Sequence, residues 1–492
     1  MAHAVVALSA GGPVAVPDVP AYLTYSQWLH GAVLPDVVPY FPGYGLLLMP
    51  FGWMSGDSLH TAALLINGVL ASLTIPLARK AVSQLSCPKW VEFVAPALAM
   101  VLPVASVASR IAWPEMLIGV TVLSLFVLLM DERWVLAGLI AGLLLAVHPR
   151  MVVVIMGCLV AAACHRSLKP VLLGLIPGIS VTALILMATN AWPESRLQAA
   201  QTVGDGINPI VTTSGQWLAL AAGTGGLAVY GLVFIVASLR RESLPAAHVF
   251  LATSAIGMLL LGGWVLAGSS RTDTILYGRY LDPWGLALTI VALAALSTGC
   301  TRRQIGLTTA GVTLIAGFIC VAASSDGVEP ARTIMTLSLG SLWSLCGGRV
   351  TLVVLAATAI ALVGLLLTFE KLYLTIALAL LLAVTGTFVD HRRLHSVGQV
   401  AEGQATMAHM VPGDVQCLAH DQSTKSYALW LYRLQLPDIH HRRLDLTIGQ
   451  QPCGRYVVAE VTALVDCGGA ELVGTEPRAN WGLWKYPSHG CP

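Results

Sequence analysis

Long apolar runs, separated by short polar or basic stretches, dominate the first 390 positions of this chain. An α-helix needs about 20 apolar residues to cross the hydrocarbon core of a bilayer. We therefore expect membrane-spanning helices near residues 58–79, 91–110, 114–130, 134–148, 150–164, 170–190, 217–239, 247–268, 284–300, 306–324, 350–369 and 371–389.

Two regions of this pattern are ambiguous. The runs 134–148 and 150–164 are short and are separated by His148-Pro149-Arg150, which predicts either a tight turn at a membrane interface or a pair of re-entrant half-helices. Residues 1–16 are apolar but lack a positively charged start, and they read either as the tail of a first spanning helix or as a flexible leader. The predicted fold is a polytopic α-helical membrane protein with about 12–13 spanning helices.

Composition agrees with a membrane protein. Hydrophobic residues make up 56% of the chain and charged residues 11%, and the mean hydropathy is +0.76. Soluble globular domains carry roughly 25% charged residues. The net charge of +2 gives no support for a nucleic-acid partner.

Basic residues predict the orientation of the helices, because short cytoplasmic loops of membrane proteins are enriched in Lys and Arg. A single alternating path places these residues on one side: Arg79, Lys80, Lys89, Arg133, Arg166, Lys169, Arg240, Arg241, Arg302, Arg303 and Lys371. The opposite, extracytoplasmic side then receives residues 18–56, 110–115, 148–150, 191–216, 270–283, 325–349 and everything after 390. The long loops are therefore predicted to lie outside the cell.

The tail changes in character after Asp390, where polar and charged residues return. We divide the chain into a transmembrane module, 1–390, and an extracytoplasmic α/β domain, 391–492. Within the tail, 456–459 and 471–473 read as strands, and 427–434 reads as a helix. The domain contains four cysteines, which predict one or two disulfides without fixing the pairing; zinc is the rival interpretation, but no matched ligand spacing supports it. They are Cys417, Cys453, Cys467 and Cys491.

The first extracytoplasmic loop, 17–56, combines an acid with aromatic residues. Asp18, Tyr22 and Tyr25 are spaced i, i+4 and i+7, so on a helix they share one face. With Trp28 and Tyr44 they suggest aromatic surfaces that contact a sugar or acceptor. The alternative is an interfacial helix for which Asp18 is only the N-cap.

The late loop 271–283 contains the sequence Arg-Thr-Asp-Thr-Ile-Leu-Tyr-Gly-Arg-Tyr-Leu-Asp-Pro. Ionisable groups beside hydrocarbon are costly and commonly functional. Arg271 and Arg279 are suited to bind a phosphate through charge-assisted hydrogen bonds, with Tyr277 and Tyr280 beside them. A structural salt bridge to Asp273 is the alternative for either arginine.

Taken together, these motifs resemble the GT-C superfamily of membrane glycosyltransferases. Its relatives include protein O-mannosyltransferases, aminoarabinose transferases and actinobacterial envelope mannosyl- and arabinosyltransferases. The resemblance covers most of the chain and rests on the order and common sidedness of local matches, followed by a polar tail: Asp18 with Ala21 to Leu29, Pro42 to Leu47, Arg110 to Glu115, His148 to Arg150, and Gly278 to Pro283.

The resemblance implies an inverting transfer of a sugar from a polyprenyl-phosphate donor on the outer face of the membrane. In that family an external aspartate is the general base, a role that falls on Asp18 with Asp36 in reserve. Glu115 would orient the acceptor or a metal. The chain departs from the family in lacking a full helix before the first loop and in having Val19 where many members have a second acid.

The same resemblance assigns the donor phosphate to basic and aromatic side chains of the later loops. These are Arg279 and Arg271, assisted by Arg150 and His148, with Tyr280 and Tyr277 lining the groove. The expected partners are a polyprenyl-linked sugar donor, membrane lipids, and an envelope glycan, lipid or protein acceptor. A need for a divalent cation, Mg²⁺ or Mn²⁺, stays open.

Three other functions fit a charged cavity in a membrane protein. One is a transporter or flippase of polyprenyl-linked lipids, although transporters usually place charges within helices rather than at their ends. Another is an O-antigen-type ligase, which relies on a longer external loop. The third is an inactive relative that binds glycans through its tail.

Overall fold

The computed structural model describes residues 11–14, 18–34, 40–54, 56–189, 191, 207–239, 244–267, 271–298, 302–324, 327–328, 330–370, 372–425 and 427–487. The helices before residue 403 are α2 Asp18–Gln27, α3 Gly43–Leu47, α4 Gly56–Ser83, α5 Val91–Val101, α6 Pro103–Ser106, α7 Glu115–Met130, α8 Trp134–Leu144, α9 Val152–Cys164, α10 Leu168–Ala188, α12 Pro209–Gly223, α13 Leu227–Ser238, α14 Ala246–Ala267, α15 Gly285–Thr298, α16 Arg302–Ala322, α17 Gly340–Leu345, α18 Val350–Glu370 and α19 Leu372–Glu402.

Each of the twelve predicted spans is α-helical over most of its described residues, which confirms a polytopic helical membrane fold. Within the described residues, six helices are long and apolar enough to cross a membrane, and α12 with α13 makes a seventh if this pair, bent by 115°, is one span. Five further apolar helices are shorter, with 10–17 residues. Between α8 and α9 the chain makes a 3₁₀ turn over Pro149–Met151, as the proline predicts for a tight turn.

Small residues let neighbouring helices approach closely. On α8, Gly138 and Gly142 face α10, where Gly174 and Gly178 face back; a Cβ on Gly174 would lie 1.8 Å from a backbone oxygen of α8. Membrane helices gain much of their association energy from close backbone packing at such positions. The α8–α10 pair is therefore fixed by four glycines at four-residue spacing.

The tail forms a five-stranded sheet in the order β2-β1-β3-β5-β4. Its elements are β1 Cys417–Asp421, α20 Ala428–Gln435, β2 His440–Leu444, β3 Tyr456–Glu460, β4 Glu471–Thr475 and β5 Trp481–Lys485. Strand β1 runs parallel to β2 and β3, and β5 runs antiparallel to β3 and β4. The predicted helix and both predicted strands are present.

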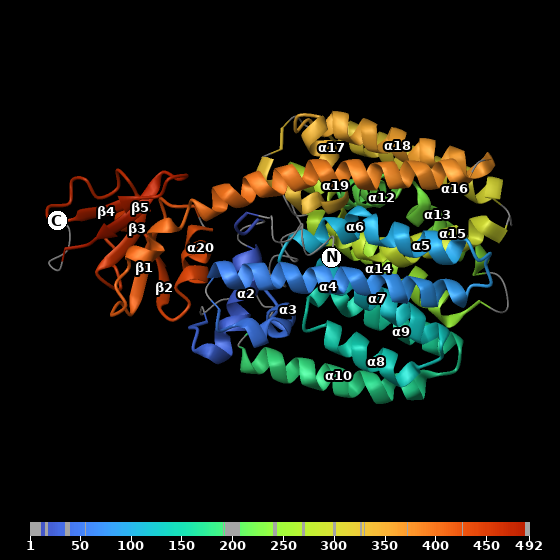
Figure 1. Cartoon of the computed structure of the whole chain (residues 1–492), viewed down its shortest axis with the longest axis horizontal. Coiled ribbons are helices and arrows are strands. Elements are labelled where there is room, and N and C mark those ends of the chain that lie inside the picture. The colour runs from blue at the N-terminus through green and yellow to red at the C-terminus, as the bar shows by residue number, and fades with distance from the viewer. Residues whose placement is uncertain are drawn as a thin grey trace.

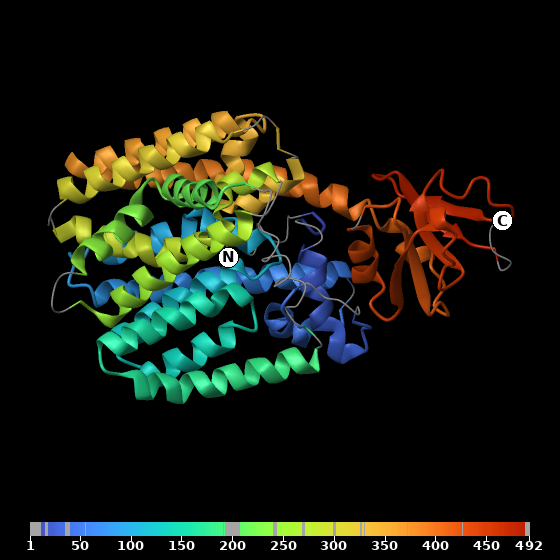
Figure 2. The ribbon, with the colours of Figure 1, turned by 180° about the vertical axis from the view of Figure 1, so that it is seen from behind.

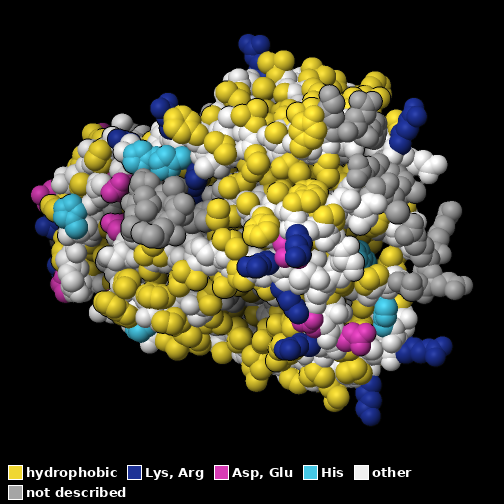
Figure 3. All heavy atoms as spheres, turned by 45° about the vertical axis from the view of Figure 1, so that its right-hand side comes forward, with side chains coloured by type: hydrophobic (Ala, Val, Ile, Leu, Met, Phe, Trp, Pro, Cys, Tyr) yellow, Lys and Arg dark blue, Asp and Glu magenta, His cyan; other side chains and the backbone are white. Residues whose placement is uncertain are grey.

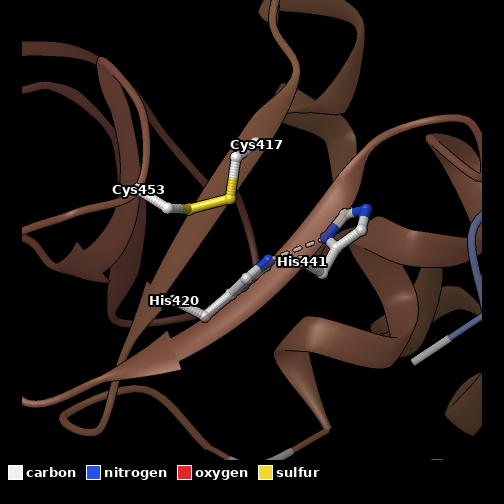
Figure 4. Close-up of a disulfide and its surroundings, with 4 residues drawn as sticks. All are labelled: Cys417, His420, His441 and Cys453. Atoms are coloured by element: carbon white, nitrogen blue, oxygen red, sulfur yellow. Dashed lines mark hydrogen bonds between the residues drawn. A yellow bond between two sulfur atoms is a disulfide. The ribbon is translucent and has the colours of Figure 1, made fainter. Parts of the chain in front are cut away.

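A disulfide and two histidines lie side by side in this domain (Figure 4). Cys417 pairs with Cys453, and Cys467 is also disulfide-bonded. His420 Nε2 lies 3.0 Å from His441 Nδ1, while His441 Nε2 lies 2.9 Å from a backbone carbonyl oxygen. Because that oxygen can only accept, His441 donates a hydrogen bond to it, and the neutral His441 accepts a hydrogen bond at Nδ1 from His420 Nε2. Cys491 lies outside the described residues.

The sheet domain is joined to the bundle by one continuous helix. Helix α19 has 31 residues and runs along the bundle and beyond it into the sheet domain (Figures 1 and 2). Helices α2 and α3 fill the space between bundle and sheet, and α20 packs on α2. The composition changes at Asp390, but α19 continues to Glu402.

The opposite end of the bundle carries basic side chains among exposed apolar ones (Figure 3). At this end, Lys80 in the last turn of α4 forms an ion pair of 3.3 Å with Asp131, which directly follows α7. The sidedness predicted from sequence places this end in the cytoplasm and the sheet domain outside, and that orientation stays a prediction.

Candidate active site

Four charged residues from distant parts of the chain meet at the end of the bundle that carries the sheet domain. Asp18 begins α2, Glu115 begins α7, Arg150 lies in the turn before α9, and Arg279 lies in the 3₁₀ turn Gly278–Tyr280 before α15. Arg279 donates from Nη1 to Asp18 Oδ2 at 2.6 Å and from Nε to Glu115 Oε1 at 2.5 Å. One guanidinium therefore connects both described candidate acids.

Glu115 also bridges the two arginines. Its Oε1 accepts from Arg150 Nη2 at 3.0 Å as well as from Arg279. The Glu115 side chain is fully buried, and those of Arg150 and Arg279 are only 4% and 5% exposed. Charges buried this deeply are tolerated only when paired. Burial opposes the charged form of Arg279, but the carboxylates of Glu115 and Asp18 outweigh it and hold the pKa of Arg279 above its ordinary value.

Local structure explains why Glu115 lies at this point. Asn67, fully buried in α4, donates from Nδ2 to the carbonyl oxygens of Ile111 at 2.7 Å and Trp113 at 3.4 Å. These bonds hold the short loop that precedes α7. The carboxylate in the first turn of α7 also suits the positive end of the helix dipole.

The segment carrying Arg279 is held in a similar way. Asp282 accepts from the backbone nitrogen and the hydroxyl of Ser338, at 3.2 and 3.0 Å. A Cβ on Gly278 would lie 2.8 Å from the side chain of Ala219 and 3.1 Å from Asp282 Oδ1. The Gly-Arg-Tyr sequence thus needs its glycine because there is no room for a side chain.

Aromatic rings and a methionine sulfur contact the two guanidinium groups. The Arg279 carbon Cζ lies 4.0 Å from the centre of the Trp113 ring, and that of Arg150 lies 4.4 Å from the Tyr280 ring. Met335 Sδ accepts from Arg279 at 3.4 Å. Cation–π contacts of this kind are strongest where water is excluded, so they fix the guanidinium planes.

Tyrosines surround the remaining oxygen of Asp18. The hydroxyl of Tyr40 donates to Asp18 Oδ1 at 2.7 Å, and the Tyr40 ring lies 5.1 Å from Tyr22. Tyr22 in turn lies 6.0 Å from Tyr44. Tyr25 donates to the backbone oxygen of Tyr40 at 3.0 Å. The aromatic face predicted from the i, i+4, i+7 spacing therefore supports Tyr40.

Three other predicted site residues each contact a different neighbour. Tyr277 stacks edge-on against Tyr280 at 5.1 Å, and burial raises the pKa of Tyr277. His148 Nδ1 accepts from the Arg150 backbone nitrogen at 3.2 Å. Arg271 pairs with Asp273 at 2.5 Å.

One predicted aromatic residue lies away from this cluster. Trp28 is half-buried and follows the end of α2, so the ten residues of that helix place it about 15 Å from Asp18. Asp36 lies outside the described residues.

Sequence reasoning did not assign Tyr40, Trp113 or Met335 to the site. Tyr40 stands in a turn-rich Pro-Tyr-Phe-Pro-Gly segment, and its spacing to Asp18 has no helical period. Trp113 stands two positions before Glu115, and this closeness in sequence is what could have indicated its place in the site. Nothing in the sequence around Met335 indicates a contact with Arg279.

Metal ligation has no cluster of its own in the described part of the chain. There, no group of three or more His, Cys, Asp or Glu side chains is arranged to hold an ion. Asp18 and Glu115 are both paired with Arg279.

Solved structures share the overall fold of this chain. No protein-family model matches the sequence, and no curated protein matches it. A crystal structure of ArnT from Cupriavidus metallidurans in the apo state aligns with 99% of this chain and 97% of its own, at a TM-score of 0.57 and 13% identity. The chain therefore has the same overall fold as this ArnT structure.

A second ArnT structure from the same organism, bound to undecaprenyl phosphate, is similar at a TM-score of 0.55 and 14% identity over 100% of this chain and 98% of that one. At such identities the likeness concerns the fold. Within this fold the cluster of four charges lies where the first loop, the start of α7, the α8–α9 turn and the late Gly-Arg-Tyr turn converge.

Proposed function

We propose that this protein is an inverting glycosyltransferase that moves a sugar from a polyprenyl-phosphate donor to a cell-envelope glycan, lipid or protein on the outer face of the membrane. The observation that carries the proposal is the buried Asp18–Arg279–Glu115–Arg150 cluster. It joins a carboxylate that can take a proton to guanidinium groups that can bind a phosphate. The GT-C fold and the ArnT structure that holds undecaprenyl phosphate support the choice of donor class.

Arg150 and Arg279 together form the phosphate site in this proposal. Among the described residues, Arg150 Nε and Nη1 have no hydrogen-bond partner, so this side chain can bind a phosphate oxygen without releasing Glu115. Two preorganised guanidinium groups stabilise the negative charge that grows on the phosphate as it leaves. Arg271 is paired with Asp273 in this structure and is a weaker candidate than Arg150.

Asp18 acts as the general base. Its carboxylate accepts the proton of an acceptor hydroxyl, whose oxygen bonds to the anomeric carbon while the bond from that carbon to the phosphate oxygen breaks. Because attack and departure occur on opposite faces, configuration inverts. Tyr40 and Arg279 each bind one oxygen of Asp18, which fixes the orientation of the carboxylate.

The test is sugar transfer by the full-length protein in membranes. We would supply radiolabelled mannosyl, arabinosyl and aminoarabinosyl polyprenyl phosphates and measure label in the envelope fraction. Asp18→Asn removes the base and should lower the rate roughly 10²- to 10⁴-fold. Arg279→Lys keeps the charge but loses the planar fork, and we expect a loss of about 10²-fold.

Two matched variants control for general effects. Asp57→Asn changes an acid that accepts a hydrogen bond from Gln435 at 2.8 Å, outside the cluster. Arg442→Lys changes an exposed residue of β2. Both should keep the rate of the unchanged protein. If Asp18→Asn retains full transfer, the base assignment is wrong. If folded protein transfers none of the donors but moves them between leaflets, it is a lipid transporter.

A further inference from the structure

A cavity of about 580 Å³ lies beside the candidate active site. Its wall comes from the 3₁₀ segment Pro330–Leu339, from α17, from the turn before α18 and from α19. The polar side chains that line it are Thr333, Trp343, Ser344, Arg349 and Arg393. This volume suits a small polar molecule or a headgroup rather than a single ion.

The charge of the lining favours an anion. Two arginines line the cavity, and no acidic residue among the described ones does. Arg349 is exposed and forms no ion pair with a described residue. Arg393 is held in place, because Nη1 donates to the Gly340 carbonyl oxygen at 2.9 Å and Nη2 donates to Thr333. Asp390, one turn earlier, interacts with Arg393 but also with Arg110, so it offsets only part of this positive charge.

Uncharged donors point to the same ligand chemistry. Trp343 is 1% exposed, and its Nε1–H has no hydrogen-bond partner among the described residues, although buried donors rarely stay unpaired in native proteins. Helix α18 begins at Val350, directly after Arg349. The N-terminus of this 21-residue helix presents the positive end of its dipole next to the lining arginine.

The surroundings are apolar, which indicates a ligand that is part lipid. Leu345 follows the lining residue Ser344 and is 73% exposed, and Leu352, near the start of α18, is 44% exposed. Both helices belong to the membrane bundle (Figure 1). A bound molecule would therefore meet cationic and N–H donors on one side and hydrocarbon-facing leucines on the other.

We propose that this cavity is a second anion site, which binds the anionic phosphate-monoester headgroup of a membrane lipid and is distinct from the Arg279 cluster. One segment separates the two sites, since Thr333 contacts Arg393 while Met335 contacts Arg279. A lipid held in the cavity would steady that segment and, through Met335, the guanidinium of Arg279.

Native mass spectrometry of the detergent-purified full chain tests the proposal. The probes are dioleoyl phosphatidic acid, dioleoyl phosphatidylcholine and inorganic phosphate. We expect phosphatidic acid to bind best and Arg349→Gln to weaken it about tenfold, the loss expected for one charge-assisted hydrogen bond. Ser344→Trp, which fills the cavity, should also reduce binding. Arg392→Gln is the matched control, because Arg392 lies next to Arg393 on α19 and packs over Phe388 instead.

Several outcomes would overturn the proposal. Equal binding of the two lipids would show that the phosphate monoester is not recognised. Equal binding by Arg349→Gln and the unchanged protein would place the lipid elsewhere. If inorganic phosphate binds as tightly as the lipid, the site serves free anions. Lipid binding is measured separately from sugar transfer. Arg279→Lys should leave lipid binding in this cavity unchanged although it lowers transfer about 10²-fold, so the two proposals fail separately.

Discussion

Glu115→Gln is the change that tests most directly whether charge holds the four-residue cluster together. Glutamine keeps the shape of the side chain but removes the negative charge shared by Arg150 and Arg279. The net charge of the cluster then rises from zero to +1, with two buried guanidinium groups facing an uncharged amide. At an effective dielectric of 20, each ion pair near 4 Å is worth about 4 kcal/mol before the desolvation of Glu115 is subtracted.

Measured losses from breaking buried pairs are about 3–5 kcal/mol, and we expect that range here. For a large chain this corresponds to a fall in melting temperature of roughly 6–10 °C. The assay is thermal unfolding of detergent-purified protein, followed by intrinsic tryptophan fluorescence at one scan rate, because unfolding of membrane proteins is often irreversible.

An exposed ion pair elsewhere in the chain provides the control for this measurement. Lys80 and Asp131 form an ion pair of 3.3 Å whose side chains are 50% and 27% exposed, and exposed pairs contribute about 0–1 kcal/mol. Asp131→Asn should therefore shift the melting temperature by no more than about 2 °C. If Glu115→Gln lowers the melting temperature no more than Asp131→Asn does, the buried charges do not hold the site together and our reasoning fails.

Three further predictions concern the sheet domain and the proposed base. Burial lowers the pKa of His441 to about 3 and that of His420 well below its ordinary value, so both are neutral near pH 7 when folded. As pH falls below about 6.5, the unfolded histidines bind protons before the folded ones do, and the domain should lose about 1.4 kcal/mol per pH unit from His441, with a further loss from His420. Faster hydrogen exchange in β1 and β2 would show this loss. Reduction of Cys417–Cys453, which closes a separation of 36 residues, should destabilise the domain by about 2–4 kcal/mol in denaturant titrations with and without dithiothreitol. Tyr40→Phe should lower kcat about tenfold with little change in KM, and unchanged kcat would contradict a positioning role.

The parts of the fold that local patterns determine could be predicted from sequence. Apolar runs predicted the membrane helices, short apolar segments predicted β3 and β4, and the helical segment 427–434 predicted α20. The bend between α12 and α13 could not be located, because residues 217–239 read as one apolar run. There Gly225 and Gly226 have φ of 57° and 83°, a left-handed backbone that ends α12.

The candidate site was predicted as separate residues and not as an arrangement. Asp18 and Arg279 are 261 positions apart, and nothing local encodes that they touch. The late-loop motif favoured Arg271 as the second phosphate-binding arginine beside Arg279. In the structure, Arg150 is the arginine that shares Glu115 with Arg279. Which arginine enters the cluster depends on helix packing around the α8–α9 turn, which periodicity does not report.

Helix α19 fixes the rotation of the sheet domain about the helix axis as well as its distance from the membrane bundle. Its 31 residues measure about 46 Å, longer than a hydrocarbon core of about 30 Å, so the rod continues past the bilayer to the domain. One residue inserted after position 391 would turn everything beyond it by about 100° while raising it only about 1.5 Å. Such a turn would carry Trp430 away from Tyr40, which its ring now faces at 6.4 Å. Seven inserted residues, close to two full turns, would bring the domain back to nearly the same bearing but about 10 Å farther out. The number of residues in α19 therefore fixes the rotation of the sheet domain about the helix axis, and the first loop contacts the domain in that one orientation.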